Sequence, residues 1–139
     1  MEHHIVLRLV TKFLLPFILL FALYVQFHGD YGPGGGFQAG VIFGAGFVLY
    51  GLIFGLENTT RIAPPMVMRF TTALGLLLYA GVGVASLFKG GNYLDYSVLG
   101  QSAKAGQHLG IILIELGVGI TVASVIVNLF YSFAGYSRR

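Results

Sequence analysis

The sequence has no cysteine and no tryptophan, and only 9% of its 139 residues are charged. The absence of cysteine excludes a disulfide-stapled module and a Cys-ligated zinc or iron-sulfur centre. Soluble globular chains usually carry about a quarter charged residues, so this chain cannot cover an ordinary water-facing surface. Its hydrophobic content of 56% also excludes a disordered segment. An integral membrane protein is the class that remains.

Four apolar windows are long enough to cross a bilayer as helices, which takes about 20 residues for roughly 30 Å of hydrocarbon. They cover about residues 5–27, 37–56, 70–88 and 109–133. The runs are continuous rather than alternating, which argues against the strands of a membrane barrel. We therefore expect an all-α integral membrane protein, with residues 1–139 forming a single transmembrane domain of four helices.

The basic residues indicate the orientation, because Lys and Arg between spans favour the cytoplasmic side. Six lie on one side of the predicted spans: Arg8, Lys12, Arg61, Arg69, Arg138 and Arg139. Only Lys89 and Lys104 lie on the other side, so both termini are expected in the cytoplasm. Because these few basic residues are scattered between apolar runs, the net charge of +3 does not indicate a nucleic-acid partner.

Small residues form a stripe on each of two predicted helices, within about 60° in the second window. The first stripe is glycine only, and the second adds hydroxyl and amide side chains. The two sets are Gly40, Gly44, Gly51 and Gly55, and Gly110, Gly117, Thr121, Ser124 and Asn128. Small residues let helix backbones approach in lipid, so we expect helix packing rather than a permeation path. Packing within the chain and packing against neighbouring subunits both stay open.

Glu115 is the charged residue inside the fourth window. It lies about 140° around the helix from Gly110, and His108 shares its side one heptad earlier. Intramembrane carboxylates are costly and often functional, so both residues are candidates for an ion path from outside water. Two interpretations of Glu115 stay open: an ion-path group, or a protonated residue that fixes the packing of a neighbouring helix. For His108, an interfacial residue without a special role is the favoured interpretation.

The loop between the first two windows reads His28-Gly29-Asp30-Tyr31-Gly32-Pro33-Gly34-Gly35-Gly36-Phe37. Pro33 restricts the backbone and the glycines after it permit positive φ, so the chain can turn sharply before the next helix. A phosphate-binding loop is not supported, because the Lys-Ser/Thr ending and a βα context are missing. We expect a tight turn, with Asp30 as a further ion-path candidate.

The segment Pro33-Gly34-Gly35-Gly36-Phe37-Gln38-Ala39-Gly40-Val41 resembles the hallmark of the MnhB family, the B subunit of Mrp-type multisubunit sodium/proton antiporters. Glu115-Leu116-Gly117-Val118 is similar to the acidic-x-Gly-Val stretch in the last helix of that family. Four spans within about the family's length extend the resemblance over nearly the whole chain. Related domains occur in the large antiporter A subunit and in complex-I-like assemblies such as membrane-bound hydrogenases.

The resemblance implies a small subunit of a prokaryotic plasma-membrane antiporter that exchanges sodium ions for protons, with large antiporter-like subunits as partners and no cofactor. The sequence contains no nucleophile-base set or metal-ligand cluster, so we expect neither an enzyme nor a metal site. No Lys or Arg lies deep in any window, so this chain is not expected to drive exchange alone. Two alternatives stay open: a self-sufficient homo-oligomeric channel or transporter, and the equivalent subunit of a complex-I-like hydrogenase.

Overall fold

The protein is all-helical over the part described by the computed structural model, residues 4–29, 31–32 and 34–135. The elements are α1 (Ile5–His28), α2 (Gly36–Phe54), α3 (Leu56–Ile62), α4 (Pro65–Phe88), the short 3-10 helix η1 (Tyr96–Leu99) and α5 (Ala103–Phe133). The four long helices are each long and apolar enough to cross a membrane. The predicted all-α protein with four apolar spans is therefore confirmed.

Two helices, α4 and α5, begin several residues earlier than the hydropathy windows predict. α4 starts at Pro65, where a proline fits the first turn because its missing N–H is not needed there. α5 starts at Ala103, after the Ser102 side chain accepts a hydrogen bond from the Ala105 N–H at 3.2 Å. Capping residues and first turns are polar or neutral, so a search for apolar runs misses them.

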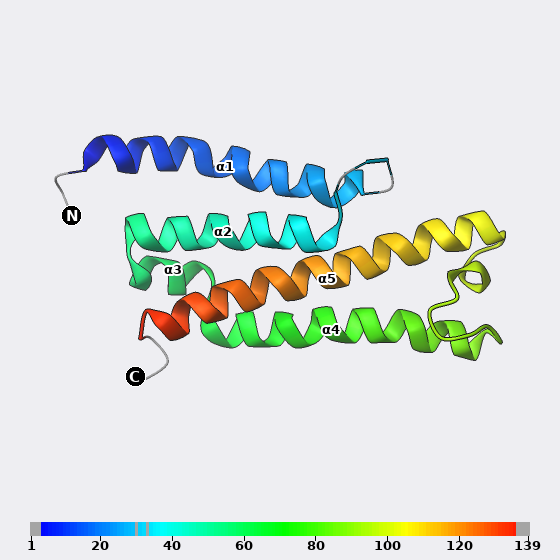
Figure 1. Ribbon diagram of the computed structural model, residues 1–139. Coiled ribbons are helices and arrows are strands. Elements are labelled where there is room, and N and C mark those ends of the chain that lie inside the picture. Colours follow the sequence, from blue (N-terminus) through cyan, green and yellow to red (C-terminus); the bar gives the residue numbers. More distant parts are fainter. Residues whose placement is uncertain (1–3, 30, 33, 136–139) are drawn as a thin grey trace.

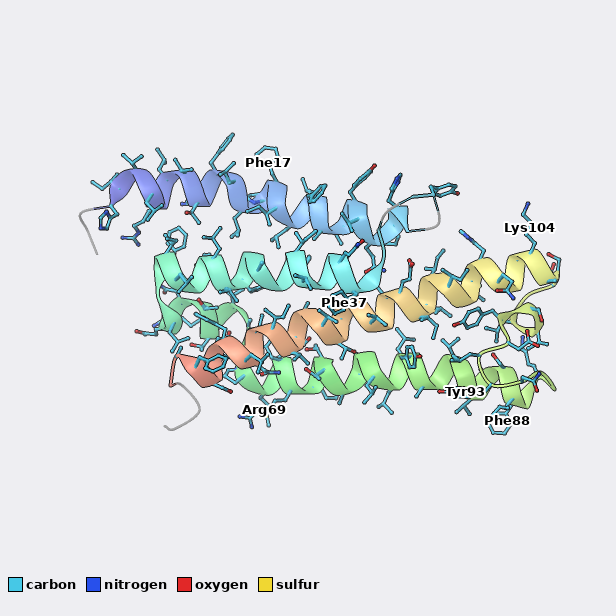
Figure 2. The ribbon with its side chains drawn as sticks, viewed as in Figure 1. Phe17, Phe37, Arg69, Phe88, Tyr93 and Lys104 are labelled. Atoms are coloured by element: carbon cyan, nitrogen blue, oxygen red, sulfur yellow. The ribbon has the colours of Figure 1, made fainter. Side chains whose placement is uncertain are left out.

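The long helices lie in a row in the order α1, α2, α5, α4, with α5 crossing obliquely between α2 and α4 (Figure 1). α1 at the edge of the row is the least covered, with Phe17 pointing away from the other helices (Figure 2). The start of α1 and the end of α5 lie at the same end of the molecule (Figure 1).

The glycine stripe of α2 packs on α5. A Cβ added at Gly40 would lie 2.7 Å from the Gly119 carbonyl oxygen, and one at Gly44 would lie 2.9 Å from the Ile126 Cβ. At Gly51 the added atom would lie 2.6 Å from the Phe130 ring. The two backbones therefore approach to a distance that larger residues at these positions would prevent.

The polar stripe of α5 packs on α4. The hydroxyl oxygens of Thr71 and Ser124 are 2.8 Å apart, and the Asn128 side-chain amide donates to the Thr72 hydroxyl at 3.4 Å. A Cβ added at Gly117 would lie 2.9 Å from the Gly75 carbonyl oxygen. The Thr121 hydroxyl, which donates to the Gly117 carbonyl at 2.8 Å, lies against Gly75. Both small-residue stripes are thus used within the chain.

Two glycines of the predicted stripes do not lie between long helices. Gly55 has a φ of 94° and follows the last residue of α2, Phe54, which lies two residues before the end of the window, and nothing lies within 4 Å of a Cβ added to Gly55. Gly110 lies against the Tyr96 ring of η1 rather than against α4. Burial raises the pKa of the Tyr96 phenol above 10.0, and Tyr79 and Tyr93 add to the shift. Tyr96 therefore remains neutral at physiological pH.

The short α3 is an element that the sequence did not predict. Its C-terminal end is hydrogen-bonded to α5: the buried Tyr131 hydroxyl donates to the carbonyl of Ala63, the residue that follows α3, at 2.6 Å. Thr59 of α3 is also fully buried. The connection between α2 and α4 is therefore packed against α5.

Candidate functional site

The chain between α1 and α2 folds back over the last turn of α1. The Gly35 N–H donates to the Val25 carbonyl at 3.2 Å, and a Cβ at Gly34 would lie 2.9 Å from the same oxygen. Gly35 has a φ of 128°, which favours glycine, and α2 begins at the next residue. The candidates Asp30 and Pro33 lie outside the described residues, as do Arg138 and Arg139.

The Glu115 side chain lies against this loop. A Cβ at Gly29 would lie 2.6 Å from Glu115 Oε1 and 2.9 Å from Oε2, and one at Gly35 would lie 3.3 Å from Oε1. Gly36 touches the Glu115 backbone carbonyl so closely that a Cβ would collide with it. The two motifs noted in the sequence, the glycine loop and the acidic stretch of α5, therefore form one site.

The contact between the loop and Glu115 was not predicted from the sequence. The loop connects the first two predicted spans and Glu115 lies inside the fourth, yet the two lie against each other. α4 and α5 run on past the α1–α2 connection (Figure 1). Twelve residues separate Ala103 from Glu115, about 18 Å at the rise of an α-helix. Stagger between the two helix pairs causes this contact.

A cavity of about 180 Å³ lies on the α1 side of Glu115. Its wall on α5 consists of His108, Ile112 and Glu115, and its opposite wall consists of Gln26, Phe27 and Tyr31. The structure thus brings His108 and Glu115 to one cavity, as their helical spacing predicts. Gln26 was missed by the sequence analysis, although an amide within an apolar run is a recognisable signal. It is 7% exposed.

A second cavity, of about 380 Å³ and open to the outside of the molecule, is bounded by the start of α2. Its lining consists of residues 34–38 together with Ile114, Glu115 and Val118 of α5. Phe37, the apolar residue of the loop motif, is part of this lining and is exposed. Of the described residues that line these two cavities, Glu115 is the one common to both.

An apolar groove of about 300 Å³ adjoins the first cavity. It shares Gln26 and Phe27 with that cavity and continues along α5 from Leu116 to Val127. The polar surface around Glu115 therefore ends where this groove begins. Among residues 4–29, 31–32 and 34–135, no three His, Asp or Glu side chains lie close enough together to hold a metal ion.

Comparison with known proteins places both motifs in one family. Residues 6–128 match the family described as "Domain related to MnhB subunit of Na+/H+ antiporter". Proteins of Staphylococcus aureus strains Newman and COL, each named "Putative antiporter subunit mnhB2", are 35% identical over 137 residues, covering 96% of this chain and 96% of each relative. The family predicted from the glycine loop and the acidic stretch is confirmed. This chain therefore belongs to the MnhB family, the domains related to the MnhB subunit of Na+/H+ antiporters.

Proposed function

We propose that this chain is a membrane subunit of a multisubunit sodium/proton antiporter in a prokaryotic cell membrane, and that Glu115 lies in the ion path. The observation that carries the second part is the position of the carboxylate. It lies against the backbone of Gly29 and Gly35 and lines the same cavity as His108. A carboxylate at membrane depth is costly to desolvate, and such residues mark ion pathways and proton relays.

In this proposal, water in the His108 cavity brings protons to Glu115. Of the described α5 residues that line this cavity, His108 is the one besides Glu115 that can carry a proton. We assign to its imidazole the step that precedes Glu115. Sodium ions and protons are the transported species, and no cofactor or catalytic site is required. Large antiporter-like subunits supply the main exchange machinery, and this chain contributes one carboxylate.

The proposal favours a hetero-oligomer over the homo-oligomeric alternative, in which small-residue faces would join copies of the chain. Most residues of these faces pack inside the chain, between α2 and α5 and between α4 and α5. The equivalent subunit of a hydrogenase-type complex remains the second candidate, because the family match describes a domain related to MnhB rather than a parent complex.

Co-purification tests the assembly. With an affinity tag on this chain and a mild detergent, we expect large antiporter-like membrane proteins to be retained in fixed ratio. A pure oligomer of this chain that transports sodium after reconstitution would contradict the proposal. Recovery of hydrogenase subunits would assign the chain to a hydrogenase-type complex instead.

We further propose that the α2–α4 connection and both termini face the cytoplasm, from the distribution of Lys and Arg. The chain has no native cysteine, so single-cysteine variants give a clean background. Asn58 of α3 and Gln101 before α5 are exposed at opposite ends of the helices. A membrane-impermeant thiol reagent on intact cells should label Gln101→Cys, and should label Asn58→Cys only after permeabilisation. The reverse pattern would invert the topology.

A further inference from the structure

The two cavities that meet at Glu115 lie on different sides of α5. At 100° per residue, Ile112 of the first cavity and Val118 of the second point about 120° apart, and Glu115 points midway between them, about 60° from each. The first cavity is completed by α1, and the second by the start of α2. A carboxylate in this position faces two separate spaces.

We propose that Glu115 carries protons laterally through this subunit, from one cavity to the other, so that the path crosses the row of helices instead of running along α5. This inference rests on the proposed role of Glu115 in the ion path. A proton needs one basic atom at each step of its path, and the Glu115 carboxylate supplies such an atom between the two cavities.

The transfer conserves atoms and charge. In the first cavity a Glu115 carboxylate oxygen forms an O–H bond as the N–H bond of a protonated His108, or the O–H bond of a hydrated proton, breaks through intervening water. The neutral carboxyl group turns about its side-chain torsions. In the second cavity the O–H bond breaks, the proton passes to water beside Gln38, and the carboxylate is restored.

Glycine gives the carboxylate the room for this turn. The oxygens face Gly29 and Gly35, where a Cβ would lie 2.6 Å and 3.3 Å from Oε1. Gly29 has a φ of −56°, a conformation that every residue adopts. The backbone at position 29 therefore does not require glycine. We infer that glycine is present there because it leaves space for the Glu115 side chain.

Water at this depth agrees with the position of the loop. Apolar residues continue on α4 to Phe88 and on α5 back to Leu109, so Glu115 lies about 9 Å inside that end of the apolar layer. Non-helical backbone at membrane depth occurs where it is buried in protein or lines a water-filled cavity. Gly34 and Gly35, which precede α2, border the second cavity.

Blocking each cavity separately tests the lateral path. The variants Ile112→Cys and Val118→Cys each place one thiol in one cavity, and Leu116→Cys, on the apolar groove, is the matched control. The purified complex is treated with a water-soluble methanethiosulfonate reagent, modification is measured by mass, and sodium-dependent proton exchange is measured after reconstitution. We expect modification at position 112 or at position 118 to abolish exchange, and treatment of the control to leave it intact. Exchange that survives modification at either cavity, or failure of either thiol to react, would overturn the lateral path.

A smaller change covers the case in which a cysteine variant does not assemble. Gly29→Ala adds one methyl group beside the Glu115 carboxylate, whereas in Gly32→Ala the methyl group faces His28 at 3.2 Å. We expect Gly29→Ala to lower exchange severalfold at normal complex yield and Gly32→Ala to leave it unchanged. Equal exchange in the two variants would contradict the turning carboxylate. If Glu115→Gln itself kept full exchange, the proposed function would fail. If modification stopped exchange at only one of the two cavities, the lateral path would fail and the proposed function would stand.

Discussion

Glu115→Gln is expected to assemble normally and to lose most of its sodium-dependent proton exchange. The amide keeps the shape of the side chain and its hydrogen-bonding capacity, so the packing against Gly29 and Gly35 is preserved. The amide cannot take up and release a proton in the physiological range. We expect a fall on the order of a hundredfold, the lower end of what loss of a positioned proton-transfer group costs.

The measurement is sodium-dependent proton exchange in everted membrane vesicles, normalised to the amount of intact complex. Glu115→Leu is the companion variant, because it removes both the charge and the hydrogen bonds. A residue that only fixes packing would tolerate Gln and lose complex with Leu. Wild-type exchange with an unchanged pH profile in the Gln variant would remove Glu115 from the ion path and leave this chain a scaffold.

Gly44→Leu is expected to reduce the amount of intact complex severely. A Cβ at Gly44 would lie 2.9 Å from the Ile126 Cβ and 3.3 Å from the Ala123 carbonyl oxygen, and the leucine adds three more carbon atoms beyond it. Overpacking a well-packed contact costs about 1–3 kcal/mol even for smaller additions. α2 and α5 would have to separate, which would also move the loop away from Glu115.

Ala45→Leu is the matched control for this prediction. Ala45 is the next residue along α2 and is exposed, so a larger side chain there meets no helix of this chain. Native gel electrophoresis of solubilised membranes should show the intact complex for Ala45→Leu and little of it for Gly44→Leu. Equal amounts of complex from both variants would show that the α2–α5 contact is not needed for assembly.

The membrane class, the four long helices and the two small-residue faces could be predicted from the sequence. These features follow from composition and from local periodicity, because a helix of lipid-facing apolar residues can be recognised without knowing its neighbours. The position of Glu115 away from the Gly110 face and on the side of His108 could be predicted for the same reason. Family membership could also be predicted, since the glycine loop and the acidic stretch are short contiguous patterns.

The partners of these features depended on the tertiary structure. Periodicity shows that Gly44 and Gly117 lie on packing faces, but only the arrangement of the helices pairs the first with Ile126 and the second with Gly75. The α3 helix was missed for a related reason. Its burial comes from Thr59 and from the bond to Tyr131, a residue far along the chain.

The site itself was decided by the stagger between helices. Hydropathy fixes approximately where each helix enters and leaves the bilayer, but it does not fix how far one helix extends beyond another. Because α5 begins about 18 Å beyond the level of Glu115, the α1–α2 loop meets the carboxylate instead of lying above it. The sequence by itself determined that a carboxylate and a glycine-rich turn exist, and the tertiary structure decided that they touch and that cavities from two sides of α5 meet there, because relative helix position arises from side-chain packing between segments far apart in the chain.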